Sequence, residues 1–115
     1  MNIKISFHNM PHSDALESHV LEKMEKIKTL FKHSRVDQPL FAELFLNAQT
    51  AHTHHTVELH IKTNQFNLTT HNEGSDMYVV CDRVIDKMVA VIKKEKSKVG
   101  DKKHRVQTEK TAFAS

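Results

Sequence analysis

Ten histidines among 115 residues are many for a side chain that readily binds metal ions. Three of them, His52, His54 and His55, fall within four consecutive positions. A zinc site needs three or four ligands that converge on the ion at about 2 Å. No acidic residue or cysteine accompanies these histidines at a fixed spacing. We interpret the cluster as a solvated loop without a metal, and a metal protein or small enzyme built on it is an alternative.

Asp82 and Asp86 lie four positions apart, which places two carboxylates on one side of a helix. Paired carboxylates can act as general acid and base or bind a metal ion. Here they flank Arg83 and Lys87, and no glycine-rich phosphate loop, nucleophile elbow, HExxH or Cys-x-x-Cys motif is present. The pattern favours a surface charge arrangement, so we expect no enzymatic activity and no cofactor.

Lysine and arginine gather in the last third of the chain. Residues 83–115 carry ten basic and four acidic side chains, a net charge of +6, whereas residues 1–82 carry seven and ten, a net of −3. Clustered cations attract the phosphates of nucleic acids. Lysine-rich helix ends also complement the helix dipole and aid solubility. Charge alone therefore leaves nucleic-acid binding and a solvated surface both open.

A helix predicted over residues 75–98 must position these cations. Gly74 ends the preceding segment, and Ser75 or Asp76 can cap the helix. Apolar residues recur at three- and four-residue steps, as on one helical face: Met77, Cys81, Val84, Ile85, Met88, Ile92 and Val99. Basic residues repeat at helical spacing about a third of a turn away, and we call them the basic ridge: Arg83, Lys87, Lys94 and Lys98.

The first part of the chain predicts a strand and a second helix. Residues 2–8 alternate between apolar and polar, as in a strand with one buried face. The helix that follows is capped by Ser13 or Asp14, with Glu17 completing a capping box if Asp14 is the cap. Its apolar face consists of Leu16, Val20, Met24, Ile27 and Phe31.

Residues 40–49 predict a strand that buries Leu40, Ala42, Leu44 and Leu46. Phe41 and Phe45 fall on its other side, which we interpret as a partly covered sheet edge; a surface on which bases stack is the alternative. Residues 50–55 are expected to form a loop.

Residues 56–62 and 65–71 predict a hairpin with a turn at Thr63-Asn64. This register places Val57, Leu59 and Ile61 opposite Thr70, Leu68 and Phe66 on one face. His60 and His71 would then share the outer face of the sheet.

The element order is therefore β-α-β-β-β-α. The first two strands should be parallel and the other pairings antiparallel, with both helices on one face of a four-stranded sheet. We expect a two-layer α+β domain over residues 1–99. Gly100 is the expected helix stop, and residues 100–115 are expected to form a flexible, basic and polar tail.

The single cysteine lies on an apolar helix face and cannot form an internal disulfide, which favours a buried thiol in a reducing compartment. The chain contains no apolar stretch long enough to span a membrane, and its start lacks the layout of a signal peptide. We therefore expect a cytoplasmic protein.

The segment Glu73-Gly74-Ser75-Asp76-Met77-Tyr78, followed by Asp82, Ile85-Asp86-Lys87-Met88 and a lysine-rich helix end, closely resembles one family. It comprises the ribosome hibernation-promoting factors and ribosome-associated translation inhibitors. Two further stretches fit this family: Ser13-Asp14-Ala15-Leu16 with Val20 and Lys23, and Val57-Glu58-Leu59-His60-Ile61. The resemblance covers about residues 1–104.

The resemblance implies a domain that lodges in the mRNA and tRNA channel of the small ribosomal subunit. There it would contact 16S rRNA and neighbouring ribosomal proteins, inhibit translation and promote hibernating ribosomes in stationary phase or stress. Shape and phosphate-facing cations suffice for such a plug, without catalysis.

Matching positions imply rRNA contacts along and beyond the second helix: Arg83, Lys87, Lys93, Lys94, Lys98, Lys102, Lys103 and Arg105. Lys23, Lys26 and Lys28 on the first helix are further candidates. Tyr78 could stack on a base or pack at the start of its helix.

The chain resembles the short type of the family, which lacks a C-terminal domain that dimerises ribosomes. A short member acts with a separate dimerising factor or opposes dimerisation through an acidic tail. The tail here is not acidic, because its basic residues outnumber its acidic ones: Lys102, Lys103, Arg105 and Lys110 compared with Asp101 and Glu109. This favours the hibernation-promoting branch. We expect a monomer off the ribosome. A free-standing module that binds double-stranded RNA is the alternative.

Overall fold

The computed structural model describes residues 2–32, 41–49, 54–63 and 67–104, and the side chains of all of these except 98–104. The elements follow the predicted β-α-β-β-β-α order: β1 (Asn2–His8), α1 (Asp14–Phe31), β2 (Phe41–Asn47), β3 (His55–Lys62), β4 (Asn67–Gly74) and α2 (Met77–His104). Within these ranges, no helix is both long enough and apolar enough to cross a membrane.

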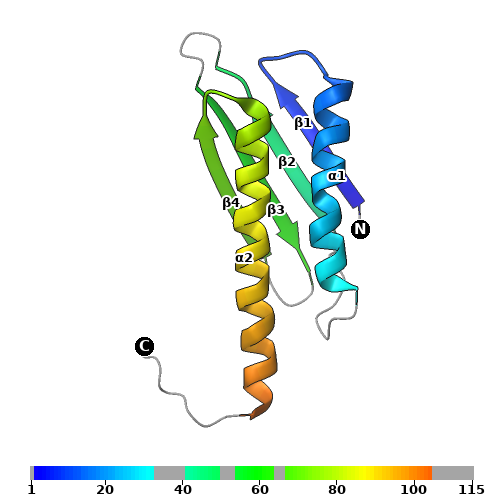
Figure 1. Ribbon diagram of the computed structural model, residues 1–115, viewed down its shortest axis with the longest axis vertical. Helices are drawn as coiled ribbons and strands as arrows, with labels where there is room; N and C mark the ends of the chain where they lie inside the picture. Colours follow the sequence, from blue (N-terminus) through cyan, green and yellow to red (C-terminus); the bar gives the residue numbers. More distant parts are fainter. Residues whose placement is uncertain (1, 33–40, 50–53, 64–66, 105–115) are drawn as a thin grey trace.

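The four strands form one sheet in the order β1-β2-β3-β4. β1 and β2 are parallel, and the other two pairings are antiparallel, as predicted. Both helices lie side by side on one face of the sheet, with α2 packed on β3 and β4 (Figure 1). The α+β prediction is therefore confirmed, and no helix of the described residues covers the opposite face of the sheet.

The hydrophobic core lies between the helices and the inward side of the sheet. The predicted face of α1 is buried in full, as are six of the seven residues predicted on α2: Met77, Cys81, Val84, Ile85, Met88 and Ile92. The side chain of the seventh, Val99, and the whole of Leu40 lie outside the part that the structure describes. Val80 is also fully buried, which widens the apolar face of α2 beyond the predicted stripe.

Side-chain oxygens cap both helices, and their hydrogen bonds show which of the two candidate residues is the cap of each helix. Ser13 Oγ accepts a hydrogen bond from the Leu16 amide at 3.1 Å, so Ser13 rather than Asp14 begins α1. Asp76 Oδ1 accepts from the Tyr78 amide at 3.0 Å, so Asp76 rather than Ser75 caps α2. Each cap pairs backbone donors that a helix start leaves free: one for Ser13 and two for Asp76.

The predicted β3–β4 register was wrong by two residues. Ile61 pairs with Leu68, Leu59 with Thr70 and Val57 with Asn72. The connection is correspondingly longer, and Phe66 falls outside the described residues. A shift of two keeps every side chain on its original face, so the apolar pattern does not distinguish the two registers. His55, assigned to a loop, is the first residue of β3.

Two further expectations about position were wrong. β2 is an inner strand of the sheet, so Phe41 and Phe45 do not mark a sheet edge. α2 does not stop at Gly100 but continues to His104. A glycine inside a helix costs only about 1 kcal/mol relative to alanine, which does not by itself end a helix.

Candidate nucleic-acid interface

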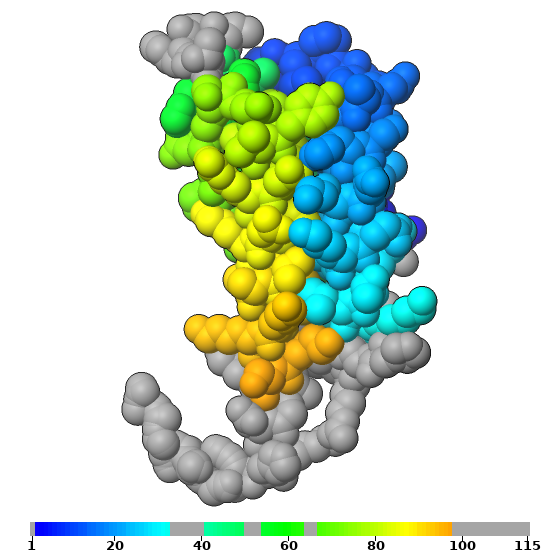
Figure 2. Space-filling model, viewed as in Figure 1, coloured from blue at the N-terminus to red at the C-terminus, as the bar shows by residue number. Residues whose placement is uncertain are grey.

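The basic ridge lies on the exposed side of α2. Arg83, Lys87 and Lys94 are all exposed, while the apolar stripe about a third of a turn away is buried in the core. In Figure 2 the outer surface of the coloured part of α2 is uncovered, next to α1. A rise of 1.5 Å per residue places Arg83 and Lys94 about 16 Å apart along the helix axis. The ridge therefore presents cations over a length suited to several phosphates.

The ridge faces the outer edge of the sheet. Lys87 Nζ donates a hydrogen bond to the backbone carbonyl oxygen of His71 on β4, at 2.8 Å. Arg83 lies beside the end of β4, where a Cβ on Gly74 would come within 3.8 Å of its guanidinium. The side of α2 that carries the basic ridge thus runs along β4, the edge strand of the sheet.

The other predicted cations of α2 extend this surface. Lys93 is exposed and lies about 100° around the helix from Lys94, toward α1. Lys102 and Lys103 belong to the last turn of α2, but their side chains, like that of Lys98, are outside the described set. Arg105 is outside it altogether.

Two of the three candidate lysines on α1 form ion pairs with carboxylates. Lys26 Nζ lies 3.1 Å from Asp86 Oδ1, and Lys28 Nζ lies 3.1 Å from Glu25 Oε2. Lys23 is half-buried. Because two of these three cations already face carboxylates, the structure puts most of the available positive charge on α2.

The Asp82/Asp86 pair is turned toward α1. Asp82 Oδ1 lies 2.7 Å from His19 Nε2, and Asp86 pairs with Lys26. The two carboxylates therefore tie the helices together, in agreement with a surface charge arrangement. The role of His19 was not predicted, because a contact between residues 63 positions apart depends on how the helices pack.

Tyr78 both packs and remains accessible. Its ring meets the His19 ring edge to face, with 5.0 Å between centroids, and the residue is 41% exposed. Both alternatives predicted for this ring, packing at the helix start and stacking on a base, are compatible with that position.

Within the histidine cluster, His54 and His55 bond to different partners. His54 Nε2 pairs with Glu73 Oε1 at 2.7 Å, whereas His55 Nδ1 accepts a hydrogen bond from the Gln49 amide at 3.2 Å. His52 lies outside the described residues. His60 and His71 do lie on one face of the sheet, as predicted, because their positions on β3 and β4 have the same orientation.

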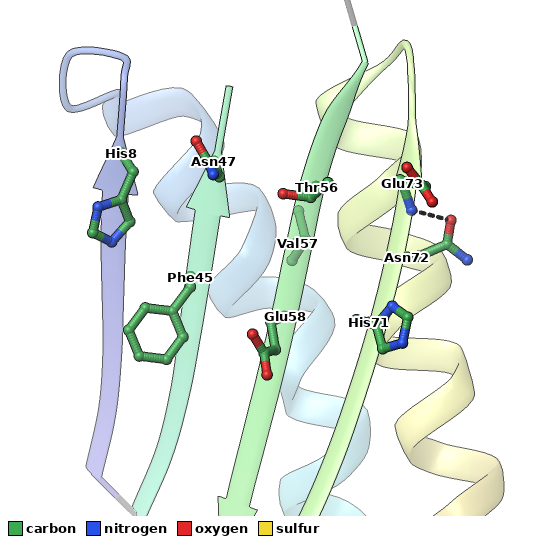
Figure 3. A pocket seen from close by; sticks show the side chains of 9 residues that line it. All are labelled: His8, Phe45, Asn47, Thr56, Val57, Glu58, His71, Asn72 and Glu73. Atoms are coloured by element: carbon green, nitrogen blue, oxygen red, sulfur yellow. Dashed lines mark hydrogen bonds between the residues drawn. The ribbon is translucent and has the colours of Figure 1, made fainter. Parts of the chain in front are cut away.

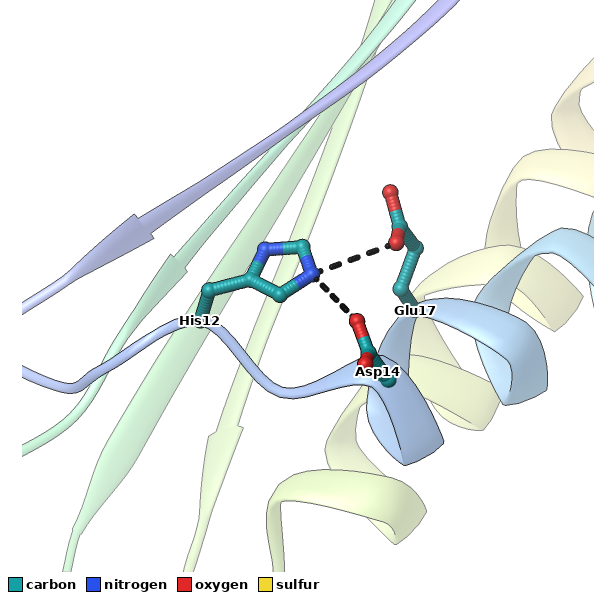
Figure 4. Close-up of side chains that lie close together, drawn as sticks. All are labelled: His12, Asp14 and Glu17. Carbon is teal, nitrogen blue, oxygen red and sulfur yellow. Dashed lines mark hydrogen bonds and ion pairs between the residues drawn. The ribbon is translucent and has the colours of Figure 1, made fainter.

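A group that sequence reasoning missed lies at the start of α1 (Figure 4). His12 Nε2 is 2.9 Å from Asp14 Oδ1 and 3.3 Å from Glu17 Oε1. The ring of Phe7 holds the His12 ring edge to face at 4.9 Å. We interpret the trio, of which Glu17 is half-buried, as ion pairs at a helix terminus, where negative side chains are favourable.

The cysteine is buried in the core between α2 and the sheet. Burial, with a smaller contribution from the negative charge of Asp82, raises the pKa of the Cys81 thiol to about 12. A thiol with such a pKa is a poor nucleophile at neutral pH.

Comparison with known proteins shows the family of the chain and proteins of similar fold. The family model described as "Sigma 54 modulation protein / S30EA ribosomal protein" matches residues 3–100. The structure resembles the Protein Y N-terminal domain of Thermus thermophilus, with a TM-score of 0.69, 20% identity, and coverage of 82% of this chain and 98% of that one. It also resembles a ribosomal subunit interface protein from Coxiella burnetii, with a TM-score of 0.68, 17% identity, and coverage of 84% and 99%.

No curated protein sequence matches this chain. At such identities the two structures establish likeness of fold alone, and the family match over residues 3–100 carries the assignment. The chain belongs to the Sigma 54 modulation protein / S30EA ribosomal protein family.

Proposed function

We propose that the protein is a non-enzymatic factor that binds the small ribosomal subunit. It occupies the mRNA and tRNA channel, contacts 16S rRNA, inhibits translation and promotes or stabilises hibernating ribosomes in stationary phase or stress. Family membership and the names of the structural relatives, a Protein Y domain and a ribosomal subunit interface protein, support a ribosomal and hence cytoplasmic location.

The observation that carries the proposal is the basic ridge. Its described cations are exposed on one side of α2, whereas Lys26 and Lys28 on α1 face carboxylates. Cations aligned on a rigid helix contact phosphates without reading base sequence, which suits binding to a fixed RNA surface. Lys102, Lys103 and Arg105 would extend the contact beyond the ridge, and Tyr78 would add a stacking ring.

Sedimentation tests the proposal directly. Purified protein is mixed with 30S, 50S or 70S particles at physiological salt and separated on sucrose gradients. We expect the protein in the 30S and 70S fractions and not with 50S subunits alone. Its absence from the 30S fraction would contradict the proposal. Added mRNA and initiator tRNA should displace it, because the proposed channel cannot hold both.

The alternative function, a free-standing module for double-stranded RNA, makes a different prediction. It requires an affinity for a naked RNA duplex that equals the affinity for 30S subunits. A weaker affinity for the duplex favours the ribosomal function. Whether a separate dimerising factor then joins is tested by mixing that factor with the complex and looking for paired ribosomes on the same gradients.

A further inference from the structure

The face of the sheet opposite the helices holds a depression of about 480 Å³ (Figure 3). It lies over the end of the sheet where β1 and β2 finish and β3 begins, and Phe45, Glu58 and His71 line it from three successive strands. A second depression of about 560 Å³ shares Thr56 and Glu73 with the first. Together they form one groove on the open face, which we call the sheet groove.

The charge of the sheet groove is opposite to that of the basic ridge. Among the described residues, its lining includes two carboxylates, Glu58 and Glu73, and no lysine or arginine. Carboxylates repel phosphates, so the sheet groove suits a cationic group rather than an RNA backbone.

Both carboxylates are accessible and are paired only with histidines among the described residues. Glu58 Oε2 lies 3.0 Å from His60 Nε2, and Glu73 Oε1 lies 2.7 Å from His54 Nε2. The side chains of Glu58 and Glu73 are 48% and 62% exposed. A histidine carries its charge only when protonated, so a permanent cation can compete for these oxygens.

An aromatic ring stands beside Glu58. The ring of Phe45 is stacked on that of His8, with 6.1 Å between centroids, and meets His60 edge to face at 5.8 Å. These neighbours orient the half-buried ring of Phe45 next to Glu58, its partner on β3. A ring face next to a carboxylate favours guanidinium over ammonium, because guanidinium stacks on rings and binds carboxylates with two hydrogen bonds.

We propose that the sheet groove binds an arginine side chain of a basic protein segment. The guanidinium lies on the Phe45 ring and pairs with Glu58, and a second cation of the same segment reaches Glu73. The inference rests on the proposed function in one respect: on the ribosome, RNA would contact the basic ridge while a basic segment of a ribosomal protein contacts the opposite face.

The test uses the full chain without ribosomes, so its result does not depend on whether the protein binds 30S subunits. The probe is the peptide acetyl-Gly-Arg-Gly-Arg-Gly-amide, titrated while the backbone amide signals of the protein are followed by NMR. The control peptide carries citrulline, which has the shape of arginine without its charge. We expect saturable shifts on β2, β3 and β4 with the arginine peptide and at least tenfold weaker binding of the citrulline peptide.

Two variants and a matched control locate the binding. Glu58→Gln and Phe45→Leu should each weaken binding of the arginine peptide at least fivefold. Glu43→Gln removes a charge from the same face of the sheet but outside the groove, next to Lys4, and should leave binding unchanged. Circular dichroism of each variant verifies that it is folded.

Three results would overturn the proposal. One is equal binding of the arginine and citrulline peptides, and another is a Glu58→Gln variant that binds as the parent does. The third is tighter binding of an RNA oligonucleotide than of the arginine peptide at the same amides, which would make the groove a base-stacking surface. If the parent protein does not bind 30S subunits but binds the arginine peptide as expected, the proposed function alone is rejected.

Discussion

Lys87 Nζ on α2 donates a hydrogen bond to the carbonyl oxygen of His71 on the edge strand β4, at 2.8 Å. The same side chain belongs to the basic ridge. An edge strand presents unpaired backbone groups that invite association, and lysine is a common means of blocking them. Lys87 therefore has a structural role in the free protein that the other described cations of the ridge do not share.

This relationship predicts a difference between two lysines of the ridge. Lys87→Met removes the donor and should destabilise the domain by about 0.5 kcal/mol, or roughly 2–4 °C in Tm, since the bond is exposed. Lys94→Met is the matched control, because Lys94 makes no hydrogen bond or ion pair with another described residue. Thermal unfolding by circular dichroism measures both, and equal Tm values would show that the bond contributes nothing.

The cap of α2 gives a second pair of variants. Asp76→Ala removes the oxygen that accepts from the Tyr78 and Val79 amides, and should cost about 1 kcal/mol, or roughly 4–8 °C in Tm. Ser75→Ala changes the neighbouring hydroxyl and should shift Tm by no more than about 2 °C. The reverse order of the two effects would mean that Ser75 is the cap.

Cys81 predicts how stability depends on pH. Its pKa is raised from 9.0 to about 12 in the folded protein, so the folded state keeps a proton that the unfolded state loses. This contribution is fully present below pH 9 and is lost as pH rises toward 12. The difference in unfolding free energy between the parent and Cys81→Ala should shrink by on the order of 2 kcal/mol between pH 8 and pH 10.5.

Urea unfolding of the parent and the variant at both pH values measures this difference. Other groups that titrate in the same range affect both proteins equally and cancel. A difference that is constant with pH would mean that the thiol is no harder to ionise in the folded state. Native protein should also react with thiol reagents only as fast as it unfolds.

The buried faces of both helices could be predicted from sequence because a period of 3.6 residues is visible without knowing any partner. Met77, Val84 and Met88 are buried as that period requires. The β3–β4 register could not be predicted in the same way. Ile61 lies opposite an apolar residue in both registers, Phe66 in the predicted one and Leu68 in the observed one. The inner position of β2 follows from the predicted pairings, which place the second strand between the first and the third, so only the interpretation of Phe41 and Phe45 as edge residues was wrong.

The candidate site likewise has features that the sequence predicted and features that it did not. The exposure of Arg83, Lys87 and Lys94 followed from their position about a third of a turn away from the apolar stripe. The pairing of Lys26 with Asp86 did not, since it depends on how two helices pack across 60 positions. The sheet groove was also invisible in the sequence, because it gathers side chains from several strands whose register the pattern left open.

The central claim is that the basic ridge holds the protein on the RNA of the small subunit. It predicts that Arg83→Gln combined with Lys94→Gln weakens binding to 30S subunits at least tenfold. Each lost phosphate contact should also lower the slope of log K against log salt by about 0.7–0.9. The control, Lys4→Gln with Lys62→Gln, removes the same charge from the open face of the sheet and should change neither quantity.

The most direct measurement is the 30S affinity of the parent and these two double variants between 50 and 200 mM salt. The account predicts tight, salt-sensitive binding of the parent and the control, and weak binding with a shallower slope for the variant of the ridge. Equal affinities and slopes for all three proteins would contradict it.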